Sequence, residues 1–240
     1  MIKENLTIGG IACTAYHRGA PKYLLIQPEG GHDPELLDRE TDALASATEQ
    51  AFLFAAFQVR DWNRELSPWK APAVFGKEAF GGGAEATVRF LLEELIPFLL
   101  QRYAVADETP VILGGYSLAA LFSLWCACRT ERFAAVAAAS PSVWFDGWIE
   151  YAGAHRPRTK CVYLSLGDRE EKAKNRILAT VGSCIRTQAA LLETAGIDCM
   201  LEWNEGNHFR DPDKRCAKGF AWCMNTLEDS EGRIRSVRKR

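Results

Sequence analysis

Short apolar runs alternate along the chain with longer segments that have helical periodicity. The runs hold few polar positions, which is typical of parallel strands covered on both faces. We predict strands over residues 6–17, 22–27, 51–59, 111–113, 133–139, 160–166 and 198–203, the second of them ended by Pro28, and helices over residues 35–49, 85–103, 118–129, 176–195 and 212–225. In the helix over 85–103, Val88, Leu95 and Leu99 share one face, and Pro97 is expected to kink it. This alternation predicts one three-layer α/β domain with a mostly parallel central sheet.

The segment 111–120 places a serine at a sharp junction between a strand and a helix. It begins Val-Ile-Leu and ends Tyr-Ser-Leu-Ala-Ala, with Ser117 at the turn, Gly115 two residues before it and Ala119 two after. A nucleophile elbow needs small residues at those two positions, because larger ones would collide with the neighbouring strand and helix. The N–H groups that open the helix would also suit an oxyanion. The pattern is short, so an ordinary turn with an incidental serine stays the alternative.

Later strand ends carry the other groups that a nucleophilic serine requires. Asp168, Glu170 and Glu171 follow one strand, and of the four histidines only His208 follows both the serine and a strand end. Right-handed crossovers bring the carboxyl ends of parallel strands to one edge, so these side chains are expected near Ser117. The order Ser, acid, His is that of α/β-hydrolase triads, in which a carboxylate orients the histidine that accepts the serine proton. Solvated surface charges are the alternative for the acidic cluster.

Residues 61–84 show no periodicity and contain Trp62 and Trp69. A loop of this length is usually functional or disordered, and its aromatic residues argue against disorder. We interpret Trp62, Trp69 and Trp144, together with Tyr116, as walls of a substrate pocket, with a flap over the sheet as the alternative. Too few residues separate the strands over 133–139 and 160–166 for a helical cap, so no separate lid domain is expected.

Net charge and cysteine spacing limit the ligands and partners that we expect for this chain. The formal net charge is −2, so no overall field attracts nucleic acid or a membrane, and no apolar stretch is long enough to span a bilayer. The eight cysteines form neither a C-x-x-C pair nor a cluster with zinc spacing. We therefore expect no metal, no cofactor and reduced thiols, and, as the N-terminus does not resemble a signal peptide, a cytoplasmic protein. Residues 1–228 are predicted to form the domain and the basic segment 229–240 a flexible tail; the sequence favours no oligomeric state.

At three of these segments the chain resembles a known family. Gly115-Tyr116-Ser117-Leu118-Ala119, Ser140-Pro141-Ser142-Val143-Trp144 and Gly206-Asn207-His208 resemble the "putative esterase" branch of the α/β hydrolases, which includes esterase D-like and ferric-enterobactin-esterase-like enzymes. The resemblance covers most of the chain from residue 85 to residue 222. It implies the α/β-hydrolase fold and a metal-free Ser–His–acid hydrolase of esters.

The resemblance also implies which residues act. The acid would stand three residues after the strand-ending Gly167, at Glu170, while Asp168 stays the runner-up. The oxyanion donors would be the N–H of Leu118 and that of Glu29 or Gly30, since Pro28 has none. We thus expect a serine esterase that acts on a small-molecule ester through an acyl-enzyme. A thioesterase or acyltransferase on the same scaffold, or a catalytically silent binding protein, are the alternatives.

Overall fold

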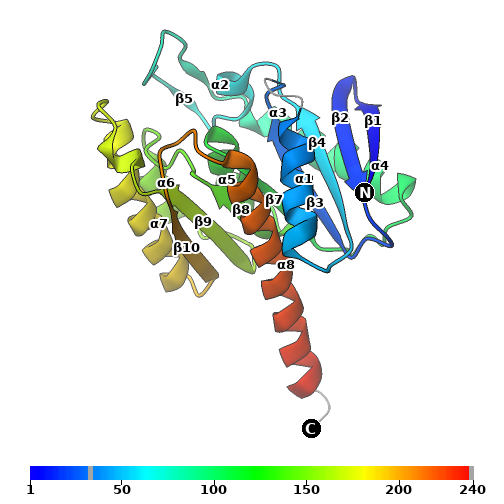
Figure 1. Ribbon diagram of the computed structural model, residues 1–240. Coiled ribbons are helices and arrows are strands. Elements are labelled where there is room, and N and C mark those ends of the chain that lie inside the picture. The colour runs from blue at the N-terminus through cyan, green and yellow to red at the C-terminus, as the bar shows by residue number, and fades with distance from the viewer. Residues whose placement is uncertain (32–34, 238–240) are drawn as a thin grey trace.

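A central sheet of eight strands organises the protein. The computed structural model describes residues 1–31 and 35–237. The strand order in the sheet is β1-β2-β4-β3-β7-β8-β9-β10 (Figure 1). The strands are β1 (Ile2–Ile8), β2 (Ile11–His17), β3 (Tyr23–Glu29), β4 (Phe52–Gln58), β7 (Val111–Tyr116), β8 (Phe133–Ala139), β9 (Cys161–Gly167) and β10 (Asp198–Asn204). β2 pairs antiparallel with β1 and with β4, whereas the other neighbours run parallel, so the predicted mostly parallel sheet is confirmed.

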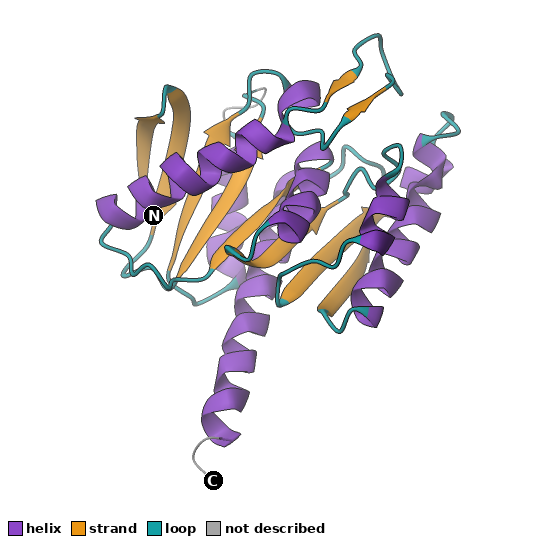
Figure 2. Cartoon of the chain, turned by 180° about the vertical axis from the view of Figure 1, so that it is seen from behind, coloured by secondary structure: helices purple, strands orange, loops and turns teal. Residues whose placement is uncertain are grey.

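Helices cover both faces and complete the three layers of an α/β-hydrolase fold. On one face lie α1 (Leu36–Ala47) and α8 (Pro212–Val237), as Figure 1 shows. The opposite face, seen in Figure 2, carries α3 (Ala84–Phe90), α4 (Ile96–Arg102), α5 (Leu118–Arg129), α6 (Trp148–Ala154) and α7 (Val181–Thr194). Buried apolar side chains line both faces of the inner part of the sheet, which explains the near-absence of polar positions in strands such as β4, β7 and β8. Only the short α6 lies between β8 and β9, and no separate lid is present in the described part of the chain.

The helix predicted over residues 85–103 has a π-helical turn in its middle. α3 passes into a π turn over Leu91–Leu95 and then into α4. The Ile96 N–H donates to the carbonyl of Leu91, five residues back, immediately before Pro97. Proline has no N–H to donate, and the wider turn accommodates this gap in the ladder. The irregularity expected at Pro97 therefore takes the form of a change in hydrogen-bond register.

Pro28 does not end its strand, contrary to the sequence prediction. β3 pairs with β7 as far as Ile26 but with β4 as far as Glu29. The carbonyl of Glu29 accepts a hydrogen bond from the Val59 N–H, so Glu29 faces β4 and Pro28 faces the opposite side. Because β7 has already left the ladder on that side, the missing N–H of Pro28 costs no sheet hydrogen bond.

The segment 61–84 is more regular than predicted. It contains the short helix α2 (Trp62–Glu65) and a small antiparallel pair formed by β5 (Lys70–Ala71) and β6 (Phe80–Gly81). Gly82 has a φ of +72°, and a Cβ there would lie 2.7 Å from the Lys70 nitrogen. The glycine run thus permits close packing of two backbones, for which the apolar periodicity gives no signal.

The closing helix is longer than predicted. α8 begins at Pro212 and continues to Val237, beyond the expected end near residue 225 (Figure 1). Most of the segment that was assigned to a flexible tail is therefore helical in backbone, while residues 238–240 lie outside the described residues. Two further 3-10 turns, Glu170–Lys172 and Leu178–Thr180, lie between β9 and α7.

Candidate active site

Ser117 occupies a strained turn between β7 and α5. Its backbone has φ +59° and ψ −118°, a conformation that non-glycine residues rarely adopt. Gly115 has a φ of +149°, and a Cβ on it would lie 2.8 Å from the Cβ of Ala119. These contacts are the physical reason for the small residues that the sequence places on either side of the serine. The turn exposes the hydroxyl of Ser117 at the carboxyl edge of the sheet.

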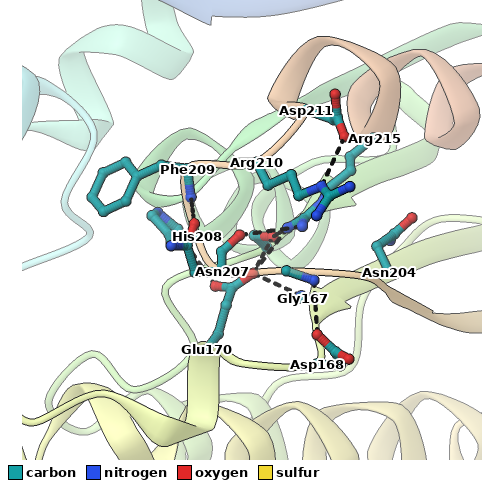
Figure 3. Close-up of polar contacts among 12 residues, drawn as sticks. Gly167, Asp168, Glu170, Asn204, Asn207, His208, Phe209, Arg210, Asp211 and Arg215 are labelled. Atoms are coloured by element: carbon teal, nitrogen blue, oxygen red, sulfur yellow. Dashed lines mark hydrogen bonds and ion pairs between the residues drawn. The ribbon is translucent and has the colours of Figure 1, made fainter.

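A line of hydrogen bonds joins three of the predicted side chains. The Ser117 hydroxyl lies 3.0 Å from Nε2 of His208, and Nδ1 of His208 lies 2.7 Å from Oε2 of Glu170. Figure 3 shows Glu170 and His208 pointing toward one another from separate loops. A carboxylate at Nδ1 requires a proton on that nitrogen, which leaves Nε2 to accept the serine proton.

Glu170 is held by three further donors. Its Oε1 accepts hydrogen bonds from the Gly167 N–H at 2.7 Å, from the Ser140 hydroxyl at 2.8 Å and from Nη1 of Arg215 at 3.1 Å. Burial acts to raise the pKa of Glu170, but the hydrogen bond and charge of His208, with the Gly167 and Ser140 bonds, outweigh it and lower the pKa below its usual value. The carboxylate is thus ionised and aimed at the histidine with Oε2.

The two neighbouring acids have other partners. Oδ1 of Asp168 accepts a hydrogen bond from the Gly206 N–H at 2.7 Å, and this bond fixes the start of the histidine loop. Glu171 pairs with Arg186 at 3.2 Å on the surface. Of the three candidates, only Glu170 contacts His208.

Arg215 is a component of the site that the sequence analysis missed. Its side chain is only 2% exposed and donates from Nη1 to Glu170, to the Ser140 hydroxyl and to the Tyr116 hydroxyl. Nη2 donates to the carbonyls of Glu205 and Asn207 in the histidine loop. One guanidinium therefore links the acid, the elbow strand and the histidine loop. Its only sequence signal is an arginine directly before the small apolar residues Cys216 and Ala217 of the closing helix.

Two more hydroxyl groups contact members of this line of residues. The Tyr116 hydroxyl donates to the carbonyl of His208 at 2.9 Å, so this residue braces the histidine loop as well as facing the pocket. Oγ of Ser142 lies 3.3 Å from Oγ of Ser117, and the Ser142 N–H donates to the Ser117 carbonyl. The Ser-Pro-Ser segment after β8 therefore packs directly against the elbow.

The candidate oxyanion donors lie at two chain segments. Leu118 opens α5, where the first N–H groups have no partner within the helix. In a parallel ladder, the N–H and C=O of one residue point to the same neighbouring strand. The Glu29 carbonyl accepts a hydrogen bond from the Val59 N–H, directly after β4, so the N–H of Glu29 also points toward β4 and away from the elbow. This geometry favours Gly30, the next residue, over Glu29 as the second donor.

An apolar cavity opens beside the elbow. It has a volume of about 340 Å³, and its lining includes Trp62, Tyr116 and Gly30. The structure does not place the other two predicted walls here. Trp69 packs against Phe145 at 5.7 Å between ring centroids, and Trp144 packs against Phe80 at 6.2 Å.

Within residues 1–31 and 35–237, no group of three or more His, Cys, Asp and Glu side chains could hold a metal ion. In the same part of the chain, no helix is both long enough and apolar enough to cross a membrane.

Solved structures that share this fold have little sequence identity with the chain. An IroE-like serine hydrolase from Shewanella oneidensis superposes with a TM-score of 0.76 at 14% identity, over 92% of this chain and 79% of that one. The siderophore hydrolase EstB from Aspergillus nidulans gives 0.73 at 17% identity, over 92% and 93% of the two chains. The enterobactin esterase FES from Shigella flexneri gives 0.67 at 13% identity, over 94% of this chain and 59% of that one. No curated protein sequence matches the chain.

A family model described as "putative esterase" matches residues 38–209. This match spans the elbow, the acidic cluster and the histidine, and it bears out the resemblance seen in the sequence motifs. The chain therefore belongs to the "putative esterase" family and is an enzyme of the carboxylic ester hydrolase class.

Proposed function

We propose that the protein hydrolyses small carboxylic esters through an acyl-enzyme, with Ser117 as nucleophile, His208 as general base and Glu170 as the acid that orients the histidine. The observation that carries the proposal is the unbroken line from the Ser117 hydroxyl to Nε2 of His208 at 3.0 Å and from Nδ1 to Glu170 at 2.7 Å. In such a line the imidazole accepts the serine proton, and the carboxylate stabilises the imidazolium that forms.

The steps of the reaction follow from these roles. Oγ of Ser117 attacks the ester carbonyl carbon while its proton passes to Nε2 of His208. The tetrahedral oxyanion accepts hydrogen bonds from the N–H of Leu118 and, in our proposal, that of Gly30. The carbon–oxygen bond to the alcohol breaks, and the leaving alkoxide takes the proton from His208. A water molecule then gives a proton to His208 and attacks the carbonyl carbon of the acyl-enzyme. The bond from that carbon to Oγ of Ser117 breaks, Oγ takes the proton back from His208, and the acid is released.

A panel of esters and matching thioesters tests the proposal. Wild-type protein should hydrolyse short acyl esters, and Ser117→Ala should lose about 10⁶-fold in kcat. Ser142→Ala removes the adjacent hydroxyl and serves as the matched control that keeps turnover. Adding an alcohol to the same assay and measuring the new ester separates transfer from hydrolysis, because both share the acyl-enzyme. Equal activity of Ser117→Ala and wild type would contradict the proposal.

We also propose that the protein acts in the cytoplasm. Five of the eight cysteines are buried and the other three are half-buried, and each is a separate thiol. Buried free cysteines behave as small apolar residues, which suits a reducing compartment.

A further inference from the structure

The cavity beside the elbow ends at two polar side chains that lack full hydrogen bonding. Glu40 on α1 is 1% exposed, and Gln27 on β3 is 5% exposed. Nε2 of Gln27 donates to Oε2 of Glu40 at 2.9 Å, but Oε1 of each residue has no hydrogen-bond partner in the described part of the chain. Buried oxygen atoms are nearly always satisfied, so two open acceptors on one cavity wall require an explanation.

Among the described residues that line the cavity, no cationic side chain balances this pair. Glu29 and Glu40 are the only carboxylic acids among the described residues that line the cavity, and that described lining contains no lysine, arginine or histidine. Asp213 lies near Glu40 and adds to the negative potential, although Asp213 itself pairs with Arg39 at 3.4 Å. The structure thus offers Glu40 no cationic partner of its own among the described residues, whereas a buried carboxyl is normally paired.

The remaining wall suits an apolar chain. Its members are Pro28, Leu36, Leu37, Trp62, Pro212 and Cys216. The indole of Trp62 could also attract a cation through its ring face. With a volume of about 340 Å³, the cavity is at the small end of the range for ligand sites, and Tyr116 and Gly30 join it to the proposed reaction centre.

We propose that this cavity is a substrate subsite for an apolar arm that ends in a protonated primary amine, so that the enzyme prefers amino esters to neutral esters of the same shape. An ammonium group offers three N–H donors, enough for Oε1 of Gln27 and Oε1 of Glu40 together. The positive charge also supplies the partner that Glu40 lacks. This inference rests on the proposed ester hydrolysis, because the subsite acts on the arm of an ester bound at Ser117.

Binding of the amine should be linked to a proton. Burial raises the pKa of Glu40 to about 8, because the charged form is disfavoured where it is not paired. An ammonium ion that enters the cavity stabilises the ionised carboxylate, and the carboxyl proton leaves to solvent. The cavity therefore does not need to hold an unpaired charge in the absence of substrate.

Two p-nitrophenyl esters test the subsite: 6-aminohexanoate and heptanoate, which differ by an ammonium in place of a terminal methyl group. Wild type should show a kcat/KM at least roughly tenfold higher for the amino ester, as expected for hydrogen bonds to a charged group. The ratio should fall to about one in Glu40→Gln, which keeps the shape and removes the carboxylate. Asp42→Asn, an exposed acid on the same helix, is the matched control and should keep the wild-type ratio.

Competitive inhibition of the wild-type protein tests the subsite without a variant, and so does not depend on whether Glu40→Gln folds. n-Pentylammonium should compete with p-nitrophenyl acetate at least roughly tenfold more tightly than 1-pentanol does. Equal inhibition by the two, equal rates for the two esters in wild type, or an amino preference that persists in Glu40→Gln would overturn the subsite. If no ester is hydrolysed, acetate included, ester hydrolysis itself fails, which is a different result from hydrolysis without preference.

Discussion

Glu40 should make the protein less stable as the pH rises, and Glu40→Gln should remove this dependence. Burial raises the pKa of Glu40 from 4.5 to about 8; the hydrogen bond from Gln27 offsets only part of this effect, and Asp213 adds repulsion. Between these two pH values the unfolded chain has released the proton and the folded protein still holds it. The unfolded state then binds fewer protons, so the free energy of unfolding falls as the pH rises.

The size of the effect follows from the shift in pKa. Each unit corresponds to about 1.4 kcal/mol. The shift from 4.5 to about 8 therefore amounts to at most about 5 kcal/mol of unfolding free energy lost across that pH range. We treat this figure as an upper bound, because a protein relaxes around a buried charge when that charge forms. In Glu40→Gln the amide keeps a hydrogen-bonding group next to Gln27 and has no proton to exchange.

Urea denaturation of wild type and Glu40→Gln at several pH values from about 5 to about 8.5 measures the difference. The variant should gain stability relative to wild type as the pH rises, and Asp42→Asn should follow the wild-type curve. If the wild-type and Glu40→Gln curves stay parallel over the whole range, Glu40 is not the buried, unpaired carboxyl that the structure describes. The inference of an amine subsite would then lose its basis as well.

Three further predictions concern the site and the thiols. Glu170→Gln should lower kcat by about 10⁴-fold, whereas Asp168→Asn should change it by only a few fold; the reverse order in steady-state assays would reassign the acid. Arg215→Met breaks a buried ion pair and should lower the free energy of unfolding by about 3–5 kcal/mol. Arg210→Met removes an exposed arginine and should lower it by less than about 1 kcal/mol. Equal losses of unfolding free energy in urea titrations would contradict this. Thiol titration in denaturant without reductant should find all eight cysteines free, and fewer free thiols would argue against the cytoplasm.

Local sequence was sufficient for most strands of the central sheet and for the elbow. β8 begins and ends where the apolar run from Phe133 to Ala139 does, because a strand buried on both faces has no polar positions to blur its ends. Ser117 was recognisable because Gly115 and Ala119 are neighbours of the serine in sequence as well as in space. Topology, which brings the ends of parallel strands to one edge, predicted that His208 and the acidic cluster lie near the serine, whereas the family resemblance favoured Glu170 among the three acids.

Features that depend on distant packing left no such signal. Arg215 contacts Glu170, which is 45 residues away in sequence, and nothing near Arg215 indicates that Glu170 is its partner. The strand through Pro28 could not be predicted, because it is tolerated only where β7 has left the ladder. The indoles of Trp69 and Trp144 were assigned to the pocket by residue type alone, whereas their neighbours Phe145 and Phe80 determine where they lie.

Covalent labelling of Ser117 tests the proposed mechanism most directly. A fluorophosphonate probe reacts with a serine that an adjacent base activates, and peptide mass spectrometry identifies the modified residue. We expect a single adduct on the peptide that contains Ser117, abolished in Ser117→Ala and greatly slowed in His208→Ala. An adduct on Ser142, which lies 3.3 Å away, or no adduct on folded wild-type protein, would contradict the assignment of the nucleophile.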